Sequence, residues 1–319
     1  MTVKLPQALR VEAFNEISAE RFNNIYRHRR PVLFKAILPE SVVNLWHEKT
    51  YLSKELLKKE GKLEVMYALD QQNFMDDVDF VEKCLVSVDS VLNTILKSTN
   101  GVDSEKLDSF KSEVDSQSLS SLQPEDDQHR RFYYRSHLSD SMLKDLDIPG
   151  IRNSLFGDRA NDPTFASESK RELTRLWVST GGNITPMHFD RCHGLLVQVY
   201  GCKRFVLVHP DDTSAVYPYD GINGPSHGAK VRHIGYSYGL NPFSEDDIVY
   251  SELVANTLAR FPKITQADIY IVDLKPGDVL YTPPGYWHEV TSLTNSISVT
   301  VPWDMSPFEL DSVPTNMAF

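Results

Sequence analysis

The chain has 319 residues, of which 41% are hydrophobic and 24% charged, and its formal net charge is −11. This composition is typical of a globular protein with a large core, and no apolar run reaches the roughly 20 residues that span a bilayer, which excludes an integral membrane protein. The polar N-terminus argues against a secretory signal peptide. Three cysteines without C-x-x-C spacing favour a reducing compartment, hence the cytoplasm or nucleus.

The N-terminal third is predicted to alternate between helices and strands. Residues 7–26 have the pattern of one or two helices, and residues 31–38 that of a strand. A helix over residues 52–59 precedes a strand over residues 63–67. A further helix over about 88–97 places its apolar residues on one face. We expect these elements to extend the sheet formed by the rest of the chain.

The segment from Asp103 to Gln128 is predicted to be a long mobile loop. It is rich in serine and holds eight acidic residues against two lysines. Its charge of −6 is more than half of the chain's total of −11. The net charge therefore says little about the surface around a binding site.

A possible metal-binding motif follows a predicted strand over residues 173–179. His188 and Asp190 are two residues apart, so in a strand they project to the same face. His288 follows another strand-like run and a Pro-Pro-Gly bend. Two histidines and one carboxylate would form the facial triad that holds Fe(II) and leaves positions open. The alternative is a hydrogen-bonded His-Asp pair at a strand end.

A lysine begins a very apolar strand just after this motif. Residues 195–200 and 203–208 are predicted to form a hairpin buried on both faces, with its turn at Gly201 and Cys202. An unpaired ammonium costs several kcal/mol when it leaves water. Lys203 therefore either extends to the rim, with Arg204 exposed beside it, or binds a carboxylate of a small acid near the metal.

The order of these motifs, completed by Thr185, Pro276-Gly277-Asp278 and Trp287-His288, resembles the JmjC family of Fe(II)- and 2-oxoglutarate-dependent oxygenases. Within the family it is similar to the small stand-alone cupin-like hydroxylases, the group that includes factor inhibiting HIF, a JmjC lysyl hydroxylase and the tRNA wybutosine hydroxylase. The resemblance implies a mainly β fold, a double-stranded β-helix (jelly roll) with flanking helices. It also implies Fe(II), 2-oxoglutarate and O2 as cofactor and co-substrates.

Carried over residue by residue, the resemblance makes His188, Asp190 and His288 the iron ligands. Lys203 and Thr185 would hold the distal carboxylate of 2-oxoglutarate, together with a tyrosine from the run Phe132–Ser136. Tyr133 is the best match. Tyr134 is one residue away and would face the opposite side.

The chain departs from the family pattern at two positions. Several relatives have an asparagine six residues after the first histidine, where this chain has Gly194, and another on the last core strand, near Pro302. Because such neighbours orient ligands and tune the metal, cofactor affinity or oxygen binding is expected to differ. His193 could replace part of this shell, or be a core histidine.

The resemblance also suggests how the chain is organised. Residues 1–135 would extend the core sheet, residues 136–305 would form the JmjC core with an insertion at 211–267, and residues 306–319 would be a short tail. This tail is too short for the C-terminal helical dimerisation domain of some relatives, which leaves the oligomeric state open.

The preferred function is hydroxylation of a protein side chain. A tRNA-base hydroxylase comes second, and would need a basic surface formed by Arg27–Arg30, Lys58–Lys62 and Arg130-Arg131. A lysine demethylase and a catalytically inactive cupin-like binding protein follow. The sequence has no DNA-binding motif.

Overall fold

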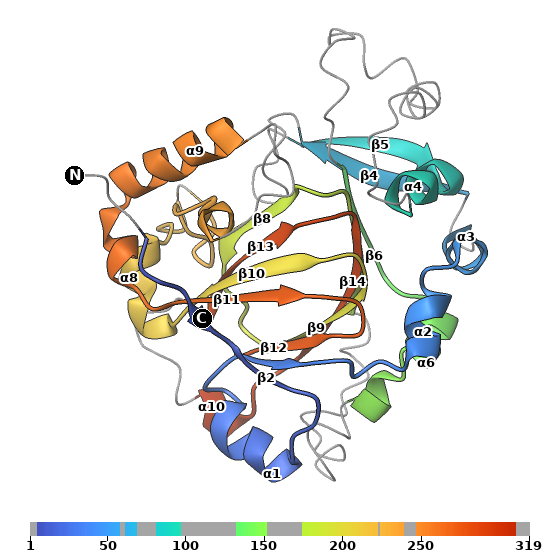
Figure 1. The fold of residues 1–319 in the computed structure, drawn as a ribbon, viewed down its shortest axis with the longest axis horizontal. Coiled ribbons are helices and arrows are strands. Elements are labelled where there is room, and N and C mark those ends of the chain that lie inside the picture. Colours follow the sequence, from blue (N-terminus) through green and yellow to red (C-terminus); the bar gives the residue numbers. More distant parts are fainter. Residues whose placement is uncertain are drawn as a thin grey trace, which may run out of the picture.

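Two β-sheets packed face to face form the body of the molecule (Figure 1). The computed structural model describes residues 5–57, 61–68, 81–96, 132–151, 174–222, 224–238 and 247–310. The loop predicted at 103–128 lies outside these residues. No helix in the described part of the chain is long and apolar enough to cross a membrane.

The smaller sheet has five strands within the described residues and carries most of the motifs identified above. In spatial order they are β1 (Leu9–Arg10), β11 (Ile269–Leu274), β10 (Lys203–Val208), β13 (Trp287–Ser292) and β8 (Ile184–His188).

The larger sheet has nine described strands. In spatial order they are β2 (Glu12–Phe14), β3 (Val32–Phe34), β12 (Val279–Thr282), β9 (His193–Tyr200), β14 (Ser296–Trp303), β7 (Arg175–Ser179), β6 (Phe132–Ser136), β4 (Lys62–Ala68) and β5 (Val81–Ser87). N-terminal strands lie at both ends of this sheet, β2 and β3 at one end and β4 and β5 at the other.

The chain alternates between the two sheets from β7 to β10 and from β12 to β14, which is the winding of a double-stranded β-helix. The predicted mainly β jelly roll is therefore confirmed. The predicted hairpin of β9 and β10 is wrong, because these strands lie in different sheets. Gly201, with φ of 64°, sits in the connection between them, and a Cβ there would lie 1.8 Å from the carbonyl oxygen of Asn295. Only glycine permits this close crossing.

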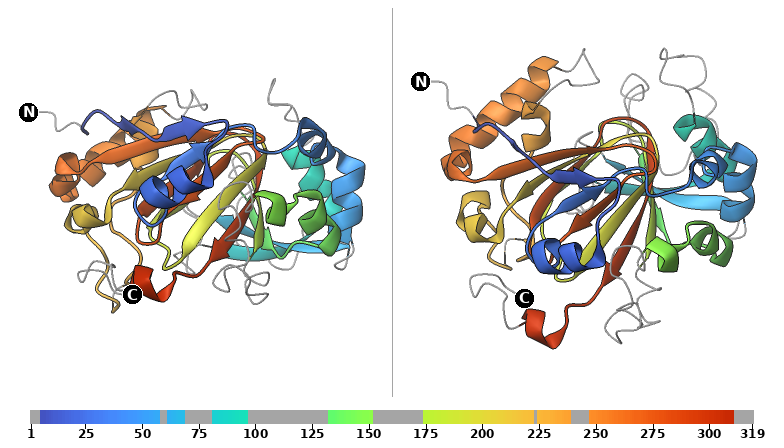
Figure 2. Two further views of the ribbon diagram at one scale, coloured as in Figure 1. Left: turned by 90° about the horizontal axis from the view of Figure 1, so that it is seen from below. Right: turned by 60° about the horizontal axis from the view of Figure 1, so that its bottom comes forward.

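Short helices flank the sheets (Figure 2). They are α1 (Ala19–Arg21), the π-helix η1 (Phe22–Tyr26), α2 (Glu40–Leu45), α3 (Lys49–Leu57), α4 (Val88–Ile95), α6 (Asp140–Asp145), η7 (Pro210–Asp212), α8 (Thr213–Val216), η8 (Ile234–Ser237), α9 (Asp247–Arg260), η9 (Pro262–Gln266) and α10 (Pro307–Leu310).

The helical prediction for residues 7–26 is half wrong, because β1 and β2 occupy its first part. Each is only two or three residues long and pairs in parallel with a strand distant in sequence. So short a segment shows no readable alternation, and its conformation is set by the sheet edge that it joins. The helix predicted over 88–97 is confirmed as α4, which begins where the Ser87 hydroxyl accepts a hydrogen bond from the Ser90 N–H.

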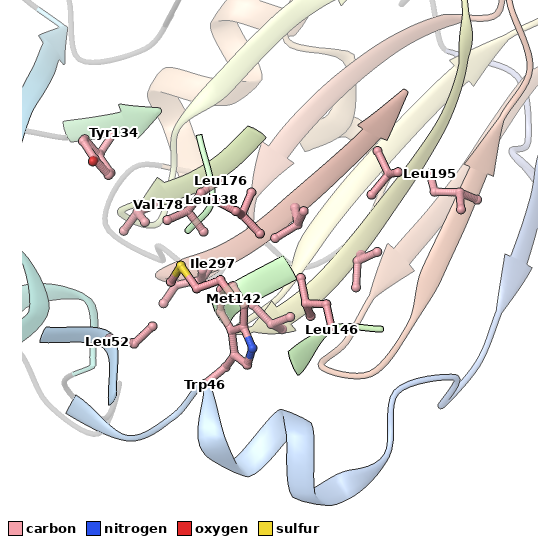
Figure 3. Packing of buried hydrophobic residues seen from close by; sticks show 14 of the residues in the cluster. Trp46, Leu52, Tyr134, Leu138, Met142, Leu146, Leu176, Val178, Leu195 and Ile297 are labelled. Atoms are coloured by element: carbon pink, nitrogen blue, oxygen red, sulfur yellow. The ribbon is translucent and has the colours of Figure 1, made fainter. Parts of the chain in front are cut away.

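The main hydrophobic core lies between the outer face of the nine-stranded sheet and the helices that cover it (Figure 3). There Trp46, Leu52 and Met142, which come from or adjoin the helices, pack against side chains of the sheet such as Leu176 and Ile297. A second core fills the space between the outer face of the five-stranded sheet and the insertion at 211–267. A third lies between the two sheets and includes Phe205, Leu207 and Val290.

Candidate metal centre

His188, Asp190 and His288 come together between the sheets. One potential ligand atom from each lies within 4.8 Å of the others, and among the described residues no other group of three or more His, Cys, Asp or Glu side chains does so. His188 and His288 are direct partners on β8 and β13, with ring centroids 4.2 Å apart. Nε2 of His288 lies 3.8 Å from Oδ2 of Asp190. The two histidines and the carboxylate thus surround one point.

Both imidazoles are oriented by backbone carbonyls. Nδ1 of His188 donates to the Pro186 carbonyl at 2.7 Å, and Nδ1 of His288 donates to the Tyr286 carbonyl at 3.0 Å. Because a carbonyl only accepts, Nδ1 carries the proton and Nε2 keeps its lone pair. Burial, and then the neighbouring His188, lower the pKa of His288. It is therefore neutral at physiological pH, as a metal ligand must be.

An irregularity in β8 brings Thr185 to the same face as His188. Residues three apart in a regular strand face opposite sides. Here Thr185 pairs with Val290 and His188 with His288. A step of three residues along β8 therefore corresponds to a step of two residues along β13. This extra residue is a β-bulge. Directly opposed residues share a face, and Val290 belongs to the core between the sheets, so all four side chains project inward.

The three candidate ligands differ in exposure. His288 is buried, whereas the Asp190 side chain is 57% exposed. The backbone of Asp190 is fixed by a hydrogen bond from the Gly285 N–H to its carbonyl oxygen, at 2.9 Å. The site is therefore anchored on the sheet and open to solvent beside the carboxylate, where further ligands can enter.

Lys203 does not extend to the rim. It is 2% exposed and points between the sheets, where Nζ donates to the Ser298 hydroxyl at 2.9 Å and lies 5.7 Å from the Tyr133 ring centroid. No carboxylate in the described part of the chain pairs with it, and burial lowers its pKa to about 7. Arg204, which the rim alternative would have left exposed, is also buried and forms two 2.7 Å hydrogen bonds to Asp273.

Tyr133, rather than Tyr134, faces the same space as Lys203. Its side chain hydrogen-bonds with Thr185, its ring packs against Trp177 at 5.6 Å, and burial raises its pKa to about 12. Tyr134 belongs to the main hydrophobic core on the other side of the sheet. The structure therefore gathers Thr185 and Tyr133 around the buried amine of Lys203.

The two departures from the family pattern are neighbours. Gly194 and Pro302 are direct partners on β9 and β14, and a Cβ at Gly194 would meet no atom within 4 Å. His193 faces the opposite side, where it stacks on Trp303 at 5.0 Å and its Nδ1 lies 2.9 Å from the Tyr281 hydroxyl. It is a core histidine and does not replace the absent asparagine.

Sequence reasoning missed two polar residues beside the site, Ser298 and Glu289. Glu289, next to His288 but on the outer face, is buried and accepts hydrogen bonds from the N–H groups of His233 and Gly235 at 2.7 and 2.8 Å. It attaches η8 to the sheet, and burial raises its pKa to about 7. For Ser298 the sequence did hold a signal, the alternation of small polar and apolar residues in Ser296–Val301. In a buried strand this alternation places the polar side chains on one face, and they need polar groups opposite them.

Comparison with known proteins identifies a family for this chain. The model of the cupin-like domain family matches residues 18–309. The chain belongs to the cupin-like domain family. Curated relatives of this cupin-like chain are JmjC proteins, and JmjC proteins are typically 2-oxoglutarate-dependent oxygenases that use Fe(II).

Three relatives illustrate the similarity of this cupin-like chain to JmjC proteins. Jumonji C domain-containing protein 5 of Drosophila melanogaster is 32% identical over 139 residues, 41% of this chain and 27% of the relative. Human HSPB1-associated protein 1 is 33% identical over 147 residues, 44% of this chain and 25% of the relative. Lysine-specific demethylase 8 of Danio rerio is 32% identical over 127 residues, 40% of this chain and 26% of the relative. The matched part spans about a quarter of these relatives' lengths.

Proposed function

We propose that this cupin-like domain is an Fe(II)- and 2-oxoglutarate-dependent oxygenase that hydroxylates a side chain of a protein substrate. One observation carries the proposal. A two-histidine, one-carboxylate cluster and a buried lysine without a carboxylate partner among the described residues project into the same space between the sheets. The first is the donor set that suits Fe(II) with open positions, and the second is a buried amine whose charged form a bound anion would stabilise.

The roles of the chain's own residues follow from their surroundings. Nε2 of His188, Nε2 of His288 and the Asp190 carboxylate would bind the metal on one side. Lys203, with Thr185 and Tyr133, would bind the distal carboxylate of 2-oxoglutarate at the other end of the site. When bound, Fe(II) and 2-oxoglutarate together activate O2 for the oxidation of a C–H bond, with release of succinate and CO2. The fold contributes orientation and a water-poor interior around the lysine.

The tRNA-base alternative has less support than the protein alternative. Arg27, one of the basic residues expected to form an approach surface, is buried and its Nε lies 2.7 Å from Oε1 of Glu309. The cluster at Arg130-Arg131 and residues 58–60 lie outside the described residues. Arg27 is therefore already neutralised by an internal partner, and phosphate contacts from it would require breaking that pair.

Lysine demethylation is the second candidate, because relatives of the matched segment are named lysine-specific demethylases, in Danio rerio and Arabidopsis thaliana. The two reactions start from the same oxidation and differ in whether the hydroxylated carbon stays on the substrate. Demethylation additionally releases formaldehyde.

Mass spectrometry of a protein extract separates these candidates. The extract is incubated with the purified chain, Fe(II) and 2-oxoglutarate, or with its His188→Ala variant. We expect substrate peptides to gain 16 Da only with the wild type. A loss of 14 Da with formaldehyde release would show demethylation instead of hydroxylation. Turnover of 2-oxoglutarate that only tRNA stimulates would show that the substrate is tRNA instead of a protein.

A further inference from the structure

The environment of the Lys203 ammonium contains a second group suited to bind an anion, the hydroxyl of Ser298. Ser298 lies on β14 of the opposite sheet and is fully buried. Its oxygen accepts a hydrogen bond from Lys203 Nζ at 2.9 Å. Since a serine hydroxyl also has one hydrogen to donate, accepting from lysine leaves that donor to be used elsewhere.

Within the described residues the Ser298 hydroxyl donates to no acceptor. Three buried serines are linked to one another instead: Ser296 lies 3.4 Å from Ser292, Ser292 donates to Ser179 at 3.0 Å, and Ser179 donates to the Thr180 carbonyl at 3.0 Å. Ser298 stands outside this chain of hydroxyls. A buried polar group without its partner is costly, so the free donor indicates a ligand.

The direct neighbour of Ser298 on β9 shows that the space is polar beyond the lysine. Gln198 is fully buried and pairs with Ser298 across the strands. Its Nε2 donates to the carbonyls of Tyr200 and Gly201, at 2.7 and 3.1 Å, while its Oε1 has no partner. Lys203 has three N–H donors, of which Ser298 takes one. The other donors of Lys203 and the Gln198 oxygen have no partner among the described residues.

We propose that Ser298 binds the distal carboxylate of the 2-oxo acid co-substrate together with Lys203. Lysine and serine then present one charged N–H and one O–H from opposite sheets to the two oxygens of a single carboxylate. Lys203 polarises the Ser298 hydroxyl through their own hydrogen bond, which strengthens the bond that the serine donates. Ser298 thereby makes the site selective for dicarboxylic over monocarboxylic 2-oxo acids. This inference rests on the proposed function.

The test compares Ser298→Ala with Ser296→Ala as a matched control. Both remove a buried hydroxyl from the same face of β14, but Ser296 contacts Ser292 instead of Lys203. Binding of 2-oxoglutarate to each Fe(II)-loaded protein is followed anaerobically by the visible charge-transfer absorption. A second probe is 2-oxopentanoate, which has a methyl group in place of the distal carboxylate. Thermal melting checks that each variant is folded.

We expect Ser298→Ala to weaken 2-oxoglutarate binding roughly ten- to hundredfold, the effect of a hydrogen bond to a charged group, and to leave 2-oxopentanoate binding unchanged. Ser296→Ala should bind both acids as the wild type does. Equal loss for the two acids, or no loss for either, would overturn the role of Ser298 while leaving the proposed function intact. Failure of the wild type itself to bind 2-oxoglutarate would overturn both.

Discussion

Replacing Lys203 by methionine should make the ligand-free protein more stable while removing its response to 2-oxoglutarate. Methionine has a similar length and no charge. Burial lowers the pKa of Lys203 from 10.5 to about 7. At pH 7.5 the unfolded chain keeps the ammonium charged, whereas the folded chain largely releases the proton, at a cost of about 4 kcal/mol.

The net gain is smaller because the substitution also leaves the Ser298 hydroxyl without its donor, which costs about 1 kcal/mol. A gain of about 3 kcal/mol corresponds to a rise in melting temperature of roughly 4 °C for a chain of this length, at about 2.1 cal/mol/K per residue. Since the folded pKa lies below the unfolded value, the penalty is complete below pH 7 and disappears as the pH rises through 10.5. The advantage of the Lys203→Met variant should therefore be small by pH 9.5.

Differential scanning calorimetry at pH 7.5 and 9.5, with and without 2-oxoglutarate and Mn(II) as a redox-stable metal, measures both effects. Lys83→Met is the control, because Lys83 is 62% exposed and pairs with Glu64 at the surface. Its melting temperature should change little. The hypothesis that Lys203 is retained for ligand binding would be refuted if the Lys203→Met variant were less stable than the wild type, or if 2-oxoglutarate still stabilised it.

Further substitutions test the other parts of the site. Asp190→Ala should lower bound iron from about one per chain to near zero without a loss of fold, since the side chain is largely exposed; an unchanged iron content by plasma mass spectrometry would contradict the triad. Tyr133→Phe should weaken 2-oxoglutarate binding several-fold and Tyr134→Phe should not, as measured by titration; the reverse order would place the wrong tyrosine in the site. Glu309→Gln should lower stability by about 1.5–3 kcal/mol at neutral pH because the buried Arg27 guanidinium loses its hydrogen bonds to a charged carboxylate. The pKa of Glu309 is lowered by its hydrogen bonds with His193 and Arg27, which outweigh burial. Its contribution is therefore present above the unfolded pKa and lost as the pH falls; denaturant unfolding that shows an equal deficit at pH 7 and pH 3 would contradict this.

The motif-bearing strands could be predicted because their side chains have few alternatives. Two-residue spacing places His188 and Asp190 on one face of any strand, and a lysine at the start of an apolar strand either extends to the rim or is buried near an anion. His288 could be proposed as the third ligand from its residue type and its place after a strand-like run, and the family resemblance then joined it to the other two, because no local rule links residues a hundred positions apart. The structure brings all four into one space between the sheets.

The features that sequence reasoning missed depend on non-local geometry. Strand pairing was assigned to neighbours in sequence, yet the connection at Gly201 passes between sheets. The bulge that turns Thr185 inward arises from the pairing of β8 with β13 and leaves no mark in local composition. Ser298 meets Lys203 only because the two sheets face each other.

Anaerobic titration with Fe(II) and then 2-oxoglutarate tests the central claim most directly. The wild type should bind one equivalent of iron and then develop the weak visible charge-transfer band of an iron-bound 2-oxo acid, and the His188→Ala variant should not. Iron binding without the band would contradict the role of 2-oxoglutarate, and the absence of iron binding would contradict the metal centre itself.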